Sequence, residues 1–261
     1  MSTLTELKTV DSWDEEVMLL SSIIKGIGGP LEILEAGCGR EWPLRLDGVD
    51  YRLTGIDLDA AALQSRVDTI GDLNEAIIGD LTVKGTIPHS RYDVIYSSFV
   101  LEHVRDAEGA LVHMLDGLKP GGLLLLRIPD RDSVYGWTAR RTPFKAHVAY
   151  YRYVLGLTDA GKPGHSPYPT YHAPVVSRDG MRDFCNRHGC SILEEWGHTY
   201  YVRGTGSRVQ ITRTYAKTLW ALSFGALAWR HNNLTYVISK SESALARSSS
   251  VEVAGLTRRF T

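Results

Sequence analysis

A glycine turn after an apolar run is the first feature of this sequence with chemical consequences. The run leads through Glu35 to Gly37 and Gly39, with Cys38 between the two glycines. Glycines at such a turn let the backbone approach a nucleotide-like ligand closely. A dinucleotide site would require a third glycine at the start of a helix, but Trp42 stands there, and the Glu35 carboxylate would repel a diphosphate. The turn therefore predicts a ligand that is positively charged and carries no phosphate.

Acidic residues recur after the next two apolar runs. Asp57 closes one run and is followed by Leu58, while Asp80 precedes Leu81 after the other. Asp59 lies on the same side as Asp57 at the strand period of two, so it is the reserve candidate for the same contact. The alternative for each aspartate is an ordinary residue of a turn.

Together these motifs resemble the class I S-adenosylmethionine-dependent methyltransferases, and more narrowly their type 11 subgroup. The first motif of that family is an acidic residue followed by x-Gly-x-Gly, usually with a third glycine where this chain has Glu41. The runs Tyr92–Ser98 and Val100–Val104 and the turn Leu118–Gly122 continue the resemblance, which covers about residues 31 to 129. It implies that S-adenosylmethionine, which carries a sulfonium and an ammonium, is the methyl donor.

The resemblance also implies roles for individual residues. Asp57 would accept hydrogen bonds from both ribose hydroxyls and Asp80 from the adenine amino group, and the Leu81 amide would meet the ring. Ser97 would line the methionine end, and Cys38 would allow close approach rather than act as a nucleophile. The predicted donor-binding residues are Glu35, Gly37, Cys38, Gly39, Asp57, Leu58, Asp80, Leu81 and Ser97.

Two histidines, His103 and His147, are the candidate catalytic bases. His103 would lie near the carboxyl end of the fourth strand, where the donated methyl group points, and a base is needed only for a hydroxyl or ammonium acceptor. Some relatives hold a divalent metal with a Glu-x-x-Glu-His run, but Phe99 replaces the first glutamate here, so no metal site is expected. The alternative for Glu102 and His103 is that they cap the next helix.

After Pro129 the regular pattern ends, and about residues 131–176 are expected to form an inserted lid. The segment is rich in arginine, aromatic residues and proline, and its His165 and His172 could also supply a base. Arginine mixed with aromatic side chains suits an anionic or sugar-bearing acceptor. The alternative is an exposed lid that is stabilised by stacking.

From Leu31 to Ile128, short apolar runs alternate with stretches of helical period, which is the pattern of parallel strands joined by helices. The sequence predicts an α/β fold with a Rossmann-like, mostly parallel sheet of seven strands, helices on both faces and an inserted lid. The expected strands are Leu31–Ala36, Tyr51–Asp57, Glu75–Gly79, Tyr92–Ser97, Leu123–Ile128, Cys190–Glu195 and Leu234–Ser239, and the clearest helices are Asp106–Leu118 and Ser177–His188.

All 261 residues are expected to form one methyltransferase domain. Residues 31–129 would form the donor-binding core, 177–240 would complete the sheet and add an apolar helix, and 241–261 would be a loosely ordered tail. That apolar helix is expected near Arg213–Trp229, and its run Leu219–Trp229 is too short to cross a bilayer, which takes about 20 residues. Core packing or a homodimer interface is expected for it, with peripheral membrane contact as the alternative.

The composition excludes several classes of protein. Lys and Arg number 29 against 30 Asp and Glu, a net charge of −1, so a large basic surface for nucleic acid is not expected. Apolar residues make up 43% of the chain, which is enough for a packed core. Three cysteines are too few for a disulfide framework, and no apolar signal segment is visible, so a cytoplasmic protein is predicted.

The predicted function is methyl transfer from S-adenosylmethionine to a hydroxyl or amine of a small-molecule, glycan or lipid-linked acceptor. An RNA methyltransferase is one alternative, which the nearly neutral charge disfavours. A non-catalytic module that keeps the donor pocket or its shape is another. A nicotinamide-dependent reductase is disfavoured by Glu35 and Trp42.

Overall fold

One mixed sheet forms the centre of the computed structural model, which describes residues 7–153, 156–162, 167–199, 202–203 and 205–241. The described strands follow the order β1-β7-β8-β6-β5-β2-β3-β4, and every neighbouring pair is parallel except those that β8 makes with β6 and β7. The strands are β1 Lys8–Val10, β2 Leu31–Ala36, β3 Tyr51–Asp57, β4 Glu75–Ile78, β5 Tyr92–Ser98, β6 Leu118–Pro129, β7 Cys190–His198 and β8 Asn233–Lys240.

The predicted α/β class is confirmed, although the sheet has eight described strands instead of seven. The additional strand is β1, which pairs with the edge of β7 from Lys8 to Val10. Three residues are too few to show the alternation by which a strand is recognised in sequence. The strands β2 and β3 have the predicted bounds, whereas β6 begins at Leu118 because the expected turn lies within the strand, with Gly121 at a φ of 75°.

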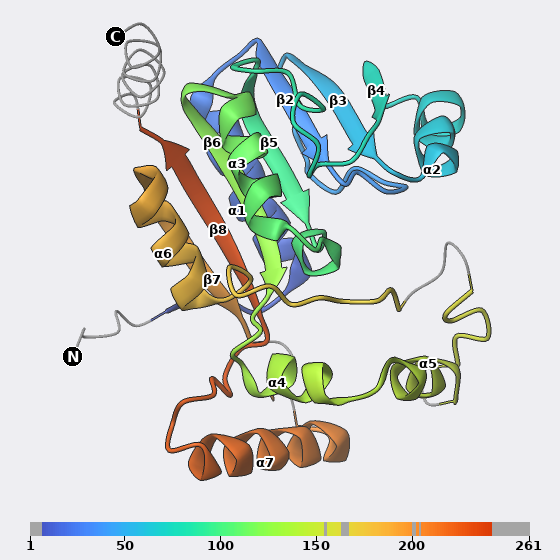
Figure 1. Cartoon of the computed structure of the whole chain (residues 1–261), viewed down its shortest axis with the longest axis vertical. Coiled ribbons are helices and arrows are strands. Elements are labelled where there is room, and N and C mark those ends of the chain that lie inside the picture. The colour runs from blue at the N-terminus through green and yellow to red at the C-terminus, as the bar shows by residue number, and fades with distance from the viewer. Residues whose placement is uncertain (1–6, 154–155, 163–166, 200–201, 204, 242–261) are drawn as a thin grey trace, which may run out of the picture.

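Helices cover both faces of the sheet, as predicted (Figure 1). On one face, α3 and α6 pack against the strands through Leu111, Met114 and Phe184, and on the other face α1 contributes Leu20 and Ile24. The helices are α1 Trp13–Ile27, α2 Ala60–Ser65, α3 Ala107–Gly117, α4 Val134–Arg141, α5 Phe144–Tyr153, α6 Arg178–His188 and α7 Ser207–Leu222, and short helical turns span Arg66–Ile70 and Leu101–His103.

The segment expected to form an inserted lid contains two helices, α4 and α5, which lie with α7 beyond the carboxyl ends of the parallel strands (Figure 1). Ser133 begins α4 by accepting a hydrogen bond from the amide of Gly136 at 3.0 Å. A Cβ atom at Gly136 would lie 2.2 Å from the carbonyl oxygen of Asp130. Glycine therefore lets α4 pack directly against the chain that leaves β6.

The prediction for the apolar run Leu219–Trp229 is wrong in two respects. The helix α7 begins earlier and ends at Leu222, because the chain turns through left-handed conformations at Phe224 and Gly225. The side chains of Leu222 and Phe224 are 70% and 99% exposed, so this run does not pack in the core. A homodimer interface there stays a prediction, and no described helix is long and apolar enough to span a membrane.

Replacement of an exposed and a buried apolar residue tests this correction. Phe224→Ser is expected to change the free energy of unfolding by less than about 0.5 kcal/mol, because the ring already faces solvent. Leu126→Ala, in the fully buried centre of β6, is expected to cost about 2–5 kcal/mol. Urea denaturation measures both, and a comparable loss in the two variants would contradict the exposed position of Phe224.

Candidate functional site

A cavity of about 820 Å³ opens at the carboxyl ends of β2, β3 and β5. In the sheet order, β2 lies between β3 and β5, so chain connections leave this point in opposite directions, which creates a crevice suited to ligands. The cavity is lined by several of the residues predicted from the sequence, namely Gly37, Gly39, Asp57, Leu58, Asp80, Leu81 and His103.

Asp57 anchors the glycine turn as well as lining the cavity. One carboxylate oxygen accepts a hydrogen bond from the amide of Gly39 at 2.8 Å, and the other accepts from the amide of Asp59 at 2.9 Å. Asp59, the reserve candidate, also lines the cavity but caps α2 by accepting from the amides of Ala61 and Ala62. Asp57 is thus the carboxylate that ties β3 to the turn after β2.

Gly37 is required where the turn passes Val100, two residues after the end of β5. Its φ of 72° is in the left-handed region, and a Cβ atom there would lie 2.3 Å from a methyl carbon of Val100. No larger residue fits both the conformation and the space.

The structure places Glu35 away from the cavity that it was predicted to serve. Its carboxylate is buried and accepts a hydrogen bond from Arg66 at 2.9 Å. Arg66 has no exposed side-chain surface and also donates to the carbonyl oxygen of Cys38 at 2.9 Å and to Asp72 at 2.8 Å. Glu35 therefore stabilises the glycine turn through Arg66, and in this structure it offers no charge to a ligand.

Ionisation of Glu35 is unfavourable because the carboxyl is buried and shares its one cationic partner, Arg66, with Asp72. Burial raises the pKa of the Glu35 carboxyl to about 8, against the opposing effect of Arg66 and with the help of nearby Asp72 and Asp57. Asp72 is the more exposed partner of Arg66.

Two further predicted residues, Cys38 and Ser97, are buried beside the cavity and do not line it. Burial, followed by the charges of Glu35 and Asp57, raises the pKa of the Cys38 thiol to about 12, which agrees with a packing role. The Ser97 hydroxyl donates to the carbonyl oxygen of Ala36 at 2.9 Å, so it joins β5 to β2.

The neighbouring Ser98 and Phe99 form the cavity wall, and Arg127 holds them in place. Arg127 donates to the Ser98 hydroxyl at 3.0 Å and to Glu16 at 2.7 Å, and its guanidinium lies 4.7 Å from the centre of the Phe99 ring. The Phe99 amide donates to the Arg127 carbonyl oxygen at 2.9 Å, which supports its left-handed φ of 55°. Burial opposes ionisation of Glu16, but hydrogen bonding with His198 and the charge of Arg127 outweigh it and lower the pKa of this carboxyl.

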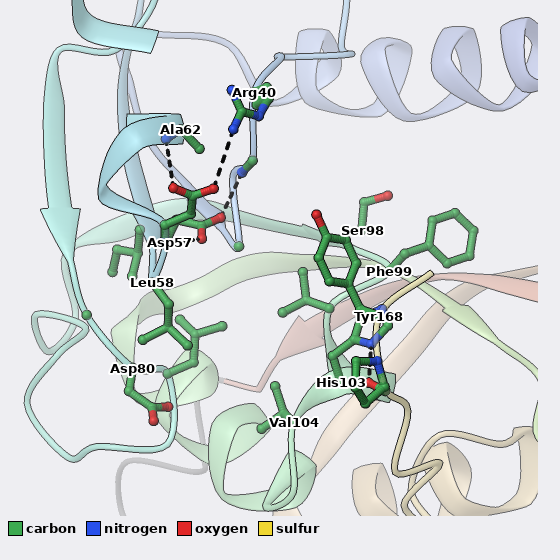
Figure 2. Close-up of a pocket in the computed structure, with 18 of the residues that line it drawn as sticks. Arg40, Asp57, Leu58, Ala62, Asp80, Ser98, Phe99, His103, Val104 and Tyr168 are labelled. Carbon is green, nitrogen blue, oxygen red and sulfur yellow. Dashed lines mark hydrogen bonds and ion pairs between the residues drawn. The ribbon is translucent and has the colours of Figure 1, made fainter. Parts of the chain in front are cut away.

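His103 lines the cavity across from Asp57, in a defined tautomer (Figure 2). Its Nδ1 lies 2.8 Å from the carbonyl oxygen of Pro169, and because a carbonyl only accepts, Nδ1 carries the hydrogen. The other ring nitrogen, Nε2, is then the basic one, and it lies 3.9 Å from a carboxylate oxygen of Glu102. Burial raises the pKa of Glu102 to about 7.

The other candidate histidines that the structure describes do not line the cavity. His147 lies on α5 and does not line it, His172 is buried next to the cavity residue Tyr171, and His165 lies outside the described residues. Within the described part of the chain, no group of three or more His, Cys, Asp or Glu side chains could hold a metal ion.

Figure 2 shows two groups of residues facing each other across the cavity. Asp57, Leu58 and Asp80 lie on one side, and His103 and Tyr168 lie on the other. We call the first group the donor end and the second the acceptor end.

Sequence reasoning missed several residues of this site. Arg40, Ser98 and Phe99 line the cavity. Each directly follows a predicted motif in the sequence, and that position could have marked them as candidates. No sequence pattern indicated a role for Arg66 or Arg127, because each acts through a partner that is distant in the chain.

Comparison with known proteins was made on both sequence and structure. Residues 11–195 match the methyltransferase domain family. The chain is 28% identical over 182 residues to trans-aconitate 2-methyltransferase of Enterobacter sp. (strain 638), covering 65% of this chain and 60% of that relative. It is 27% identical over 132 residues to ubiquinone biosynthesis O-methyltransferase of Rickettsia canadensis (strain McKiel), covering 43% of this chain and 53% of that one. The chain thus spans less than two thirds of these relatives.

A solved structure gives the same fold. The N-methyltransferase NodS from Bradyrhizobium japonicum WM9 superposes with a TM-score of 0.51 at 16% identity, covering 88% of this chain and 96% of that one. At this identity the likeness shows the fold alone.

The buried Glu35 carboxyl predicts a specific dependence of stability on pH. Folded Glu35 keeps its proton to higher pH than the unfolded chain does, so the folded state binds more protons between about pH 4.5 and about pH 8. Stability should therefore fall as the pH rises through this window, by up to about 1.4 kcal/mol per pH unit from this group.

Glu35→Gln should flatten this dependence, because an amide cannot ionise while its oxygen can still accept from Arg66. Glu41→Gln, in an exposed position of the same loop, is the matched control and should keep the slope of the parent protein. Urea titrations at a series of pH values give the slopes, and parallel profiles for the parent and Glu35→Gln would be evidence against the raised pKa.

Proposed function

Because the chain belongs to the class I S-adenosylmethionine-dependent methyltransferases, we propose that it methylates a hydroxyl or amine of a small-molecule acceptor in the cavity between the donor and acceptor ends. The enzyme takes its methyl group from S-adenosylmethionine. The observation that carries the proposal is the basic Nε2 of His103, which is held in its tautomer across the cavity from Asp57.

The residues at the donor end fit a nucleoside. Each Asp57 oxygen accepts one backbone hydrogen bond and keeps acceptor capacity for a ribose hydroxyl. One Asp80 oxygen accepts from the amide and the hydroxyl of Thr82, which leaves the other for the adenine amino group. Leu58 is largely exposed and presents an apolar surface at the cavity for the ring.

The acceptor end supplies a base. His103 would take the proton of a hydroxyl or ammonium at Nε2 while its Nδ1 hydrogen remains bonded to Pro169. The imidazolium formed would lie 3.9 Å from Glu102, whose negative charge stabilises it when the carboxyl is ionised.

Positioning accounts for the rest of the mechanism. S-adenosylmethionine supplies a methyl group on a good leaving group, so the acceptor needs to be aligned with it and kept from water. Phe99 and Tyr168 provide aromatic walls at the acceptor end, and the Arg127 contacts keep Phe99 in place.

The names of the relatives support a small molecule over the glycan or lipid-linked acceptors that were also predicted. One relative is named for trans-aconitate, an acid, and another for ubiquinone biosynthesis. We further propose that the enzyme acts in a reducing compartment such as the cytoplasm, since its three cysteines are free.

Donor binding distinguishes Asp57 from the reserve candidate Asp59. Asp57→Asn is expected to weaken binding of S-adenosylhomocysteine at least about tenfold, because a charge-assisted hydrogen bond is lost. Asp59→Asn keeps a good helix cap and is expected to change the affinity less than about twofold. Isothermal titration measures both, and an equal loss in the two variants would assign the ribose contact to Asp59 as well.

Methyl transfer to a panel of hydroxyl and amine acceptors, followed with donor labelled in its methyl group, tests the proposal itself. His103→Ala is expected to lower kcat about 100-fold with a hydroxyl acceptor, while the affinity for S-adenosylhomocysteine changes only slightly. His89→Ala, an exposed histidine away from the cavity, is the control and should behave like the parent. An unchanged kcat in His103→Ala would remove it as the base.

A further inference from the structure

Three side chains that have no role in the proposed function meet behind the acceptor end. Arg131 follows β6, and its amide donates to the carbonyl oxygen of Val176 at 3.2 Å, which brings it beside the segment that contains His172. Arg140, at the end of α4, reaches back to Asp132 at 3.5 Å. The charges of Arg131 and Arg140 both act on the His172 ring. We call Arg131, Arg140 and His172 the basic recess.

Each member of the basic recess has a buried polar atom without a hydrogen-bond partner. These atoms are Nε of Arg131, Nε of Arg140 and Nδ1 of His172. His172 as a whole is only 8% exposed. A buried polar group that lacks a hydrogen bond costs about 1–3 kcal/mol, and native proteins leave few of them, so three in one place indicate that a bound group completes the site.

The charges of the recess are only partly balanced. Asp132 lies 3.6 Å from Arg131 and 3.5 Å from Arg140, but it is half exposed and serves both. The other nearby carboxylate, Asp130, is bonded to His231 at 2.8 Å. Burial and then the charge of Arg131 lower the pKa of Arg140. An additional negative charge would relieve this repulsion.

His172 lies in the positive electrostatic field of the same two arginines. Burial, together with the charges of Arg140, Arg131, His103 and His147, lowers the pKa of His172 to about 4. The ring is therefore neutral at pH 7 and adds hydrogen-bonding capacity without adding charge.

The recess adjoins the cavity along the chain. The side chains of Arg131 and Arg140 are 20% and 25% exposed, so part of each remains accessible while its Nε is covered. Tyr171, which directly precedes His172, lines the cavity, and its amide donates to the carbonyl oxygen of Glu102 at 2.7 Å. His172, and with it the recess, therefore lies one residue along the chain from the cavity lining.

We propose that Arg131, Arg140 and His172 bind a carboxylate of the methyl acceptor, so that the acceptor is an acidic small molecule. The inference rests on the proposed function in treating the bound anion as the acceptor. Two guanidinium groups that share one loosely held aspartate suit the single charge of a carboxylate better than a doubly charged phosphate.

The test uses acetate, with neutral acetamide as its matched control. The protein is labelled at its histidine rings, and the His172 resonances are identified with His172→Asn, since asparagine tolerates the left-handed φ of 47°. At constant ionic strength, acetate should shift these resonances and raise the pKa of His172, because a nearby anion stabilises the imidazolium. Acetamide should do neither.

Variants assign the effect to the recess. Arg140→Gln should weaken the acetate response at least about tenfold, and Arg131→Gln should do the same. Arg141→Gln, the neighbouring arginine that lies over the Trp137 ring, should keep the parent response. Binding of S-adenosylhomocysteine, measured in each variant, shows whether the donor end remains folded.

Three results would overturn the inference: no response of His172 to acetate, an equal response in the Arg140 and Arg141 variants, or binding of inorganic phosphate without binding of acetate. The titration needs no methyl transfer, so its outcome is separate from the proposed function. If acetate binds but no acceptor is methylated, the proposed function is refuted and anion binding by the recess is retained. If neutral acceptors are methylated but acetate does not bind, only anion binding by the recess is refuted.

Discussion

The donor end depends on the burial of one positive charge, that of Arg66. Its guanidinium has no exposed surface, yet it holds the carbonyl oxygen of Cys38 and the carboxylates of Glu35 and Asp72. Removing a charge from water costs several kcal/mol unless such partners surround it. With Cys38 fixed, the glycine turn can pass close to β5 and present its backbone to the cavity. The acidic residue of the motif therefore acts on the turn, and Asp57 is left to line the cavity.

The acceptor end is built on the same principle with a different arginine. Arg127 is bonded to buried Glu16 on one side and to Ser98 on the other, with aromatic rings of Trp13 and Phe99 over its guanidinium. The cavity is thus bounded by two turns, which follow the carboxyl ends of β2 and β5. Each turn is held by a guanidinium and a carboxyl group that do not line the cavity. Loop residues of the site are in this way fixed by the core, which limits their freedom when a ligand binds.

Local features of the sequence were enough to predict most of the sheet and much of the donor end. The runs that became β2 and β3 are apolar and end at glycine or aspartate, and such signals lie within a few residues of each other. The misplaced features all depend on distant partners. The Glu35–Arg66 pair spans 31 residues and the Glu16–Arg127 pair spans 111, and no periodicity records such a contact. The exposure of Leu222 and Phe224 was missed for a related reason, because an apolar run does not reveal whether anything covers it.

The buried carboxylate of Glu16, near the start of the chain, has partners on strands that are synthesised last. Besides Arg127, this buried carboxylate is bonded to His198 and to Thr235. Both lie beyond residue 195, where the match to the methyltransferase domain family ends. A nascent chain that lacks β7 and β8 can pair Glu16 with Arg127 but lacks the contacts from His198 and Thr235, which form only when those strands join the sheet. The cavity wall that Arg127 supports is therefore encoded early in the chain but receives its last contacts from the strands made last.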